Sequence, residues 1–318
     1  MRSAVLGARV RALLLADIML LAVAVLWGTS YGVAKQTLAY YPVLGFLVVR
    51  FGITFLILLP AFFSAGPTEG RNALRAGLPL GGILLAIFLC ETFGVALTRA
   101  SNAAFLISLC VVFTPFVEWL VLRARPDATA FVMVGVSLTG ALLLTQGGSH
   151  GGVNLDYNLG DALILLAAVL RAFMVVMTKR LTLRRPAAAL PLTTVQSGVV
   201  CFGSLAAIAL FHPDSLPALP NAPAFWLGTL YLVLFCTVFA FFAQNYAVPR
   251  CTPTRVALLM GSEPAFGALF AVFWLHETLS AQGWFGGMLI VGVALWTALP
   301  RQQPAPKPIP IPRQVGTG

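Results

Sequence analysis

ADIMLLAVAVLWGTSYGVAK (residues 16–35) and GDALILLAAVLRAFMVVMTK (residues 160–179) are apolar segments of equal length, each with an aspartate at its second position and a lysine at its end. Equivalent residues are offset by 144 positions in both pairs: Asp17 with Asp161, and Lys35 with Lys179. Two later pairs repeat with offsets of 151 and 149: Arg99 with Arg250, and Pro115 with Pro264. A repeat with nearly constant offset over this length of chain predicts two homologous halves.

The composition indicates a membrane protein. Hydrophobic residues make up 59% of the chain and charged residues only 9%, whereas soluble domains are about 25% charged. The mean hydropathy is +0.92 over 318 residues. The repeated runs are about 20 residues long, which is the length that crosses about 30 Å of hydrocarbon as a helix. We therefore predict an all-α polytopic membrane protein that lies in a lipid bilayer.

Ten apolar runs of suitable length occur, five in each half. We interpret each as a transmembrane helix, because continuous apolar runs of this length are typical of membrane spans. The expected spans are 12–34, 43–64, 78–97, 103–122, 130–145, 159–178, 191–211, 224–248, 255–275 and 283–299.

The spans divide the chain into five regions. We expect a cytoplasmic N-terminus at 1–11, a first five-helix repeat at 12–147, an external loop at 148–158, a second five-helix repeat at 159–299, and a disordered Pro-rich cytoplasmic tail at 300–318. The first span is longer than the 7–15 apolar residues of a signal peptide, and it belongs to the repeat, so we interpret it as a retained helix.

The basic residues predict the orientation. With ten spans both termini lie on one side, and if that side is cytoplasmic, sixteen of the twenty lysines and arginines lie inside. Only Lys35 and Arg99 fall outside, and Arg50 and Arg171 lie within spans. We therefore expect a multi-pass protein of a bacterial inner membrane with both termini in the cytoplasm. The net charge of +10 then faces anionic lipid, so nucleic acid is not an expected partner.

Five spans per repeat is an odd number, so the second repeat enters the membrane in the opposite sense to the first. Inverted repeats are related by a pseudo-two-fold axis in the membrane plane, and transporters of this design bind substrate near the midplane. The sequence therefore predicts a secondary transporter for a small molecule, with two gates around one cavity. A monomer is the expected working unit, although the sequence leaves the oligomeric state open.

Four segments carry a family resemblance: LWGTSYGVAKQ (26–36), VRFGITFLIL (49–58), GDALILLAAVLRAFMVV (160–176) and NYAVPRCTPTRVALLMGSEPAFGALFAVFWLHETLS (245–280). They resemble the EamA-type members of the drug/metabolite transporter superfamily, whose ten-helix exporters carry two five-helix repeats. The last segment has the family's basic turn at a helix end, Glu-Pro within a helix and closing ET-L. The resemblance covers most of residues 12–299.

Within that family the chain is most similar to the bacterial aromatic amino-acid exporters of the YddG type. The resemblance implies export of amino acids, aromatic ones and other small metabolites, by alternating access. One departure is that the first half ends its fourth helix with EWLVLRARPD (118–127), where the second half has LHET (275–278), so any role of Glu277 is not duplicated. An exporter of cationic drugs or other metabolites is the alternative within the superfamily.

Five ionisable side chains lie inside the predicted spans: Arg50, Glu91, Glu118, Arg171 and Glu263. A charge there costs roughly 2.5–3.5 kcal/mol unless it is paired or faces water. Arg50 and Glu91 lie seven and six residues from the outer ends of their spans, so we predict that they pair. Arg171 and Glu118 both lie in the inner half and form the second expected pair. Each pair is either a structural contact or part of a gate or substrate site.

Arg171 and Glu263 are also candidates for substrate contact. Arg171 occupies the position equivalent to Trp27, so symmetry is broken where a cavity is expected, and a substrate carboxylate is a suitable partner. Glu263 precedes Pro264, whose ring removes a backbone hydrogen bond and loosens the helix. Protonation of Glu263 is one way to couple export to a proton gradient, and a purely structural role is the alternative. Pro115 and Pro264 are the expected hinges of the two gates.

Aromatic residues suit a flat or apolar cargo. Trp27 and Tyr31 lie one turn apart on the first span and share a face. Together with Glu91 and Tyr231 they belong to the predicted substrate-binding set. Twenty-three phenylalanines are also an ordinary number of lipid-facing residues in such a protein, so packing is the alternative for each. The further candidates for the lining are Phe88, Phe93, Phe105, Phe235 and Phe239.

Patterns typical of enzymes, metal sites and nucleotide sites are absent or misplaced. GTSYG (28–32) matches the hydrolase pattern G-x-S-x-G, but it lies in a membrane helix, where Gly28 and Gly32 favour close helix packing. The histidines lack metal-ligand spacing, the cysteines form no C-x-x-C, and no phosphate-binding loop is present. We therefore expect no cofactor, no metal and no catalytic residue. A membrane-embedded enzyme and a channel are the alternatives from other classes, and the repeat within one chain favours a transporter over both.

Overall fold

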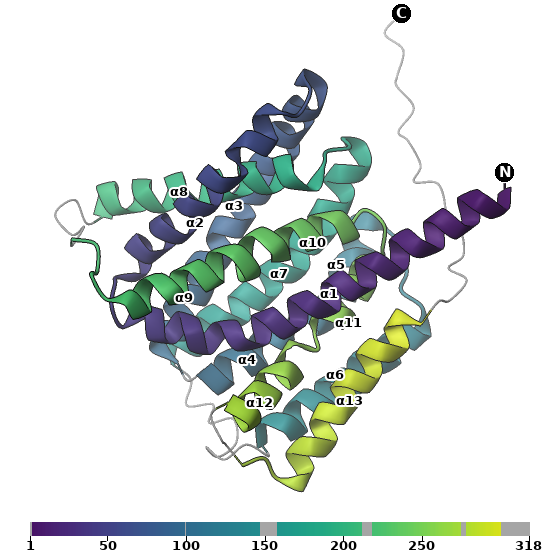
Figure 1. Ribbon diagram of the computed structural model, residues 1–318. Helices are drawn as coiled ribbons and strands as arrows, with labels where there is room; N and C mark the ends of the chain where they lie inside the picture. Colours follow the sequence, from purple (N-terminus) through teal and green to yellow (C-terminus); the bar gives the residue numbers. More distant parts are fainter. Residues whose placement is uncertain (1, 99, 147–157, 212–217, 275–277, 300–318) are drawn as a thin grey trace, which may run out of the picture.

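The computed structural model describes residues 2–98, 100–146, 158–211, 218–274 and 278–299, and the described chain is almost entirely helical (Figure 1). The elements are α1 (Arg2–Leu38), α2 (Val43–Phe63), α3 (Pro67–Leu97), α4 (Ala100–Ser108), α5 (Cys110–Leu122), α6 (Ala128–Gln146), α7 (Leu159–Arg184), α8 (Ala189–Phe211), α9 (Pro223–Val233), the π-helix η1 (Leu234–Phe239), α10 (Ala240–Ala247), α11 (Pro253–Met260), α12 (Glu263–Trp274) and α13 (Ala281–Ala298).

Nine helical stretches among the described residues are long and apolar enough to cross a membrane. The ninth predicted span, 255–275, is divided into α11 and α12, each of which is too short to cross alone. Helices α4 and α5 contribute to one span, Ala103–Leu122, and α9, η1 and α10 form another, Pro223–Ala247. The prediction of ten transmembrane helices in two five-helix repeats is confirmed, with a break in the fourth span of each repeat.

Helix α3 is longer than its hydropathy indicates. It begins at Pro67, in the first helical turn, where the missing N–H of proline costs nothing. The sequence placed the start of this span at residue 78. The added turns carry the polar residues Glu69, Arg71 and Arg75, which a hydropathy pattern assigns to a loop. Hydropathy therefore located the apolar part of the helix and missed its polar extension.

Equivalent helices of the two repeats pack against one another. Helix α2 packs on α8, and α6 packs on α13. These pairs lie at opposite edges of the molecule, with α1, α7, α11 and α12 between them (Figure 1). A Cβ atom on Gly140 would lie 2.8 Å from the carbonyl oxygen of Gly286, and the reverse distance would be 2.5 Å, so α6 and α13 approach through bare backbone. Such pairing is what a pseudo-two-fold axis between the repeats requires.

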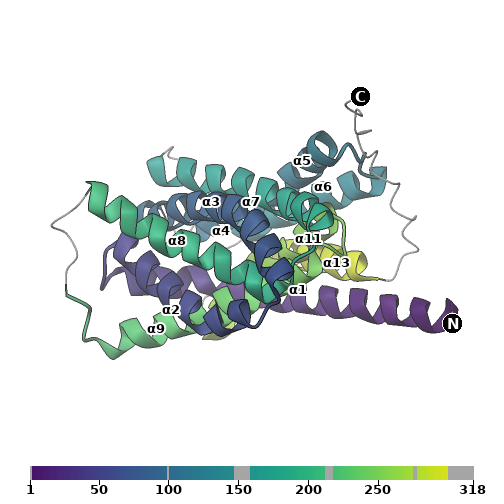
Figure 2. The ribbon, with the colours of Figure 1, turned by 90° about the horizontal axis from the view of Figure 1, so that it is seen from above.

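Helix α1 runs from one end of the helix bundle to the other. Its first turns extend beyond the other helices (Figure 2), and it then runs from Asp17 to Lys35. We call the corresponding ends of the molecule the Asp17 end and the Lys35 end. Helix α7 is inverted, because Asp161 in its first turn lies near Lys35, both of them bonded to Thr98. The inverted orientation of the repeats is thus visible in one set of contacts.

Several predicted features lie outside the described residues. They are the tail at 300–318 and residues 148–157 of the predicted loop. Arg99, Glu277 and the histidines at 150, 212 and 276 also lie outside the described residues.

Candidate functional site

A cavity lies between the two repeats, near the middle of the bundle. The same three positions of α1 and α7 line it, offset by 144 residues: Trp27 with Arg171, Ser30 with Met174, and Tyr31 with Val175. Because equivalent positions face it from both repeats, the cavity lies on the pseudo-two-fold axis. The other lining residues are Ala34, Leu38, Phe46, Arg50, Leu84, Ile87, Phe88, Glu91, Thr92, Val95, Ile107, Ser108, Cys110, Thr114, Phe241, Gln244, Ala257, Met260, Gly261 and Glu263.

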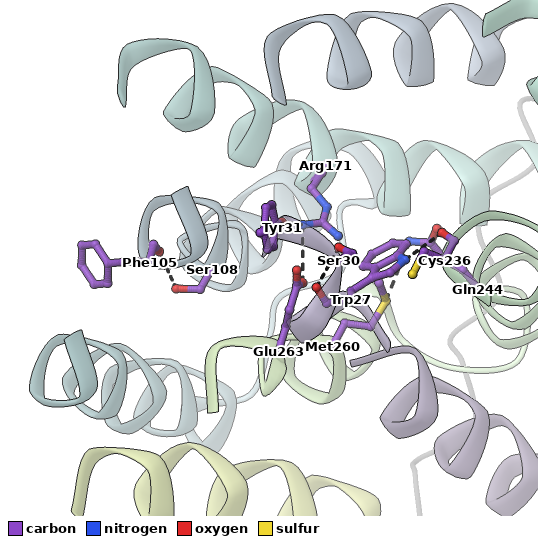
Figure 3. A network of polar contacts seen from close by, with 10 residues as sticks. All are labelled: Trp27, Ser30, Tyr31, Phe105, Ser108, Arg171, Cys236, Gln244, Met260 and Glu263. Carbon is purple, nitrogen blue, oxygen red and sulfur yellow. Dashed lines mark hydrogen bonds and ion pairs between the residues drawn. The ribbon is translucent and has the colours of Figure 1, made fainter. Parts of the chain in front are cut away.

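Arg171 and Glu263 form an ion pair in this cavity, with 3.6 Å between Nη1 and Oε2. The same Nη1 donates to the hydroxyl of Tyr31 at 3.4 Å, and the guanidinium carbon lies 4.4 Å from the ring centroid of Trp27 (Figure 3). The structure therefore brings together four of the predicted site residues. Groups from α1 and α12 hold the arginine of α7 by charge, hydrogen bond and cation–π contact.

The predicted pair of Arg50 and Glu91 is wrong. Both residues line the cavity, but Arg50 Nε donates to the hydroxyl of Thr237 in η1 at 2.9 Å. Its guanidinium carbon lies 5.1 Å from the ring centroid of Phe88 and 5.6 Å from that of Phe51. Equal depth did not produce a pair, because the arginine side chain extends toward η1 and these two rings, which offer an acceptor and two π faces.

The predicted pair of Arg171 and Glu118 is also wrong. Glu118 in α5 accepts hydrogen bonds from the backbone N–H of Thr254, at 2.9 Å, and from the hydroxyl of the same residue. Thr254 lies in the first turn of α11, where free N–H groups and the helix dipole favour a carboxylate. Glu118 therefore stabilises the start of α11, which leaves Arg171 to pair with Glu263.

Five aromatic side chains face the cavity: Trp27, Tyr31, Phe46, Phe88 and Phe241. The ring of Phe241 packs edge-on between two others, with its centroid 5.9 Å from that of Trp27 and 6.0 Å from that of Phe88. Sequence reasoning identified Trp27, Tyr31 and Phe88 and missed the other two. A wall of this kind offers a flat apolar surface to a ligand.

Tyr231, predicted to bind substrate, does not line the cavity. Its hydroxyl lies 2.5 Å from that of Thr29 and 3.4 Å from the carbonyl oxygen of Leu26. Thr29 is two residues from Trp27, which places it on another side of α1, because successive helical residues are rotated by about 100°. The lining also does not include four phenylalanines that the sequence offered as candidates: Phe93, Phe105, Phe235 and Phe239.

The π-helix η1 explains why the sequence predicted the wrong residues of the α9–α10 span to line the cavity. A π-helix has more residues per turn than an α-helix, so it rotates every side chain that follows it. Phe241 and Gln244 consequently face the cavity. The same turn also positions two lining residues, because the carbonyl of Cys236 accepts the indole N–H of Trp27 at 2.9 Å and Thr237 accepts from Arg50. No residue pattern in the sequence distinguishes this turn from ordinary α-helix.

The fourth span of each repeat is broken where it meets the cavity. The first break is at Leu109, between α4 and α5, and the second is at 261–262, between α11 and α12. Pro264 follows the second break directly, whereas Pro115 lies inside α5, several residues beyond the first. Discontinuous helices are typical of substrate sites in transporters, because they present free backbone groups to a cavity. The hinge role of the two prolines stays a prediction.

Gly28 brings α1 close to α12. A Cβ atom on Gly28 would lie 2.7 Å from both the carbonyl oxygen of Glu263 and the backbone nitrogen of Gly267. Close packing was predicted for Gly28 and Gly32 alike, but a Cβ on Gly32 would meet no atom within 4 Å. The prediction is therefore right for Gly28 and wrong for Gly32. The contact at Gly28 fixes the helix that carries Glu263.

A polar cluster joins the repeats at the Lys35 end. Lys35 Nζ donates to the carbonyl of Thr98 at 2.7 Å, within the first repeat. The hydroxyl of Thr98 donates to Asp161 of the second repeat at 2.5 Å. The loop between α3 and α4 is thus held by the lysine of α1 and the aspartate of α7.

The equivalent residues form a matching cluster at the Asp17 end. Lys179 Nζ donates to the carbonyls of Pro249 and Cys251, at 2.6 and 2.9 Å, in the loop between α10 and α11. Arg255 binds both carboxylate oxygens of Asp17 in the other repeat, at 3.0 and 2.7 Å. In each cluster a lysine holds a loop of its own repeat, while an aspartate connects to the other repeat.

Comparison with known proteins gives a consistent result. The model of the EamA-like transporter family matches the chain twice, over residues 14–146 and 158–299. An uncharacterized transporter of Archaeoglobus fulgidus is 28% identical over 279 residues, covering 87% of this chain and 84% of the relative. A second one from that organism is 26% identical over 232 residues, covering 71% and 76%. The uncharacterized transporter YwfM of Bacillus subtilis is 28% identical over 194 residues, covering 58% and 60%.

The fold also has a counterpart among solved structures. One crystal structure matches with a TM-score of 0.70 and 20% sequence identity, and the match covers 89% of this chain and 96% of the other. At this identity the likeness shows the fold alone.

Proposed function

The chain belongs to the EamA-like transporter family, and we propose that it exports amino acids, aromatic ones among them, by alternating access around the cavity between its repeats. The observation that carries this proposal is the lining of the cavity by equivalent positions of α1 and α7. A substrate on the pseudo-two-fold axis is reached from either side of the membrane when the two repeats exchange conformations.

The charges and rings of the cavity favour an amino acid as cargo. Arg50 and Arg171 are balanced by Glu91 and Glu263, so the lining carries no formal net charge. A molecule that bears both an ammonium and a carboxylate group is complementary to such a site, and the aromatic wall accepts its side chain. A cationic drug is the alternative that Glu91 favours, but two guanidinium groups in the same cavity oppose it.

The clusters at the two ends supply the elements that alternating access requires. Each cluster ties together the two repeats through equivalent residues, so opening one end means breaking its aspartate contact while the other persists. The lysine and arginine distribution supports a cytoplasmic location for the Asp17 end. Amino acids would then enter past Asp17 and leave past Lys35.

Counterflow in liposomes tests the function. Liposomes that contain the purified protein are loaded with unlabelled phenylalanine and diluted into a trace of labelled phenylalanine. We expect a transient accumulation of label, because the outward gradient of unlabelled phenylalanine drives exchange through one alternating site. Protein-free liposomes should show none, and a labelled organic cation should accumulate little. The proposal fails if no amino acid accumulates with folded protein, and accumulation of the cation alone supports the drug exporter.

A further inference from the structure

Two opposite charges in the cavity have no ion-pair partner among the residues that the structure describes. Glu91 makes no ion pair or hydrogen bond within the described residues, and Arg50 uses only its Nε, in the bond to Thr237. The terminal Nη groups of Arg50 therefore have no protein acceptor in the described chain. By contrast, Arg171 and Glu263 compensate each other at 3.6 Å. The cavity thus contains one satisfied ion pair and one separated pair of charges.

An unpaired charge in the hydrocarbon region is unfavourable unless water or a ligand neutralises it. Arg50 and Glu91 come from adjacent helices, α2 and α3, and face the same space without forming their own ion pair. Phe88 lies one turn before Glu91 on α3, and the Arg50 guanidinium carbon lies 5.1 Å from the centroid of its ring. Arg50, Glu91 and the ring of Phe88 therefore line one cavity, and the ring that contacts Arg50 belongs to the helix that carries Glu91.

We infer that Arg50 and Glu91 form a subsite for a zwitterion, in which Arg50 binds the carboxylate of the cargo and Glu91 binds its ammonium group. The inference rests on the proposed function and assigns the two ends of the amino acid within it. The side chain of the cargo lies on the wall made by Phe88, Phe241 and Trp27. Thr237 is a positioning residue, because its hydroxyl fixes Nε and leaves the Nη groups free for a carboxylate.

Three ligands that share one ring separate the two charges. Phenylalanine carries both groups, 2-phenylethylamine only the ammonium, and 3-phenylpropionate only the carboxylate. Their affinities are measured by calorimetry on detergent-solubilised wild type, Arg50→Gln and Glu91→Gln. Arg50→Gln should weaken phenylalanine and 3-phenylpropionate by about ten- to hundredfold, and 2-phenylethylamine by less than about threefold. Glu91→Gln should weaken phenylalanine and 2-phenylethylamine by a similar factor and spare 3-phenylpropionate.

The ligand that each variant is expected to spare is its own folding control. If Arg50→Gln does not yield folded protein, Arg50→Lys replaces it, because lysine keeps the charge. Arg50→Lys should weaken the binding of phenylalanine and 3-phenylpropionate less than expected for Arg50→Gln, and should leave the binding of 2-phenylethylamine unchanged. The subsite is overturned if wild type binds phenylalanine but each variant weakens all three ligands equally, or if Arg50→Gln weakens only the amine. A wild type that binds none of the three ligands contradicts the proposed function itself, together with the subsite.

Discussion

Arg171→Gln is expected to destabilise the protein by about 3–5 kcal/mol, because it leaves the Glu263 carboxylate buried without a cation. The side chain of Glu263 is only 6% exposed, and its Oε1 already lacks a hydrogen-bond partner within the described residues. The same substitution also removes the cation–π contact with Trp27. The loss is measured by denaturing the detergent-solubilised variant alongside wild type.

Two variants control this experiment. Arg171→Gln combined with Glu263→Gln removes both charges and should recover most of the lost stability, because no unpaired charge remains. Arg184→Gln removes an exposed charge at the end of α7 and should change stability little. If Arg171→Gln is as stable as Arg184→Gln, or if the double variant is less stable than Arg171→Gln, the ion pair has not been assigned correctly.

Gly28→Ala is expected to cost about 1–3 kcal/mol, because the new methyl group would lie 2.7 Å from backbone atoms of Glu263 and Gly267. Backbone atoms cannot rotate away as a side chain does, so α1 and α12 must separate. Since α12 begins with Glu263, transport should fall together with stability. Both are measured, by denaturation and by phenylalanine counterflow.

Gly32→Ala is the matched control, one turn further along the same helix. A Cβ atom there meets nothing within 4 Å, and alanine is favoured over glycine in a helix, so stability should stay equal or rise slightly. Equal losses in both variants would mean that the close approach of α1 and α12 is not the cause.

The sequence predicted the fold well because the fold depends on signals that are long and repeated. Apolar runs of about 20 residues fix the number of spans, and an odd number per repeat fixes their inversion. Residues 27 and 171, which are equivalent in the two repeats, also indicated where the pseudo-two-fold axis passes, because Trp27 and Arg171 are in contact. The broken span of the second repeat contains Gly261 three residues before Pro264, and both residue types weaken a helix.

The charge pairs could not be predicted from the sequence, because the sequence gives the depth of a side chain in the membrane but not the direction in which it extends from its helix. Arg50 and Glu91 share a depth, yet the direction of Arg50 is set by Thr237, whose place depends on the π-helix. Glu118 is bound by the backbone N–H and the hydroxyl of Thr254 in the first turn of α11, and its depth in the membrane does not indicate this contact. Local irregularities of the backbone therefore decided the site, and hydropathy does not record them.

Cys110 provides the most direct measurement of the central claim that the cargo binds in this cavity. Cys110 lines the cavity, whereas Cys90, Cys201, Cys236 and Cys251 do not. In a variant that keeps Cys110 as its only thiol, saturating phenylalanine should slow modification by a small methanethiosulfonate reagent, while an equal concentration of sucrose should not. An unchanged rate with phenylalanine, in protein that still exchanges phenylalanine in liposomes, would contradict a cargo site between the repeats.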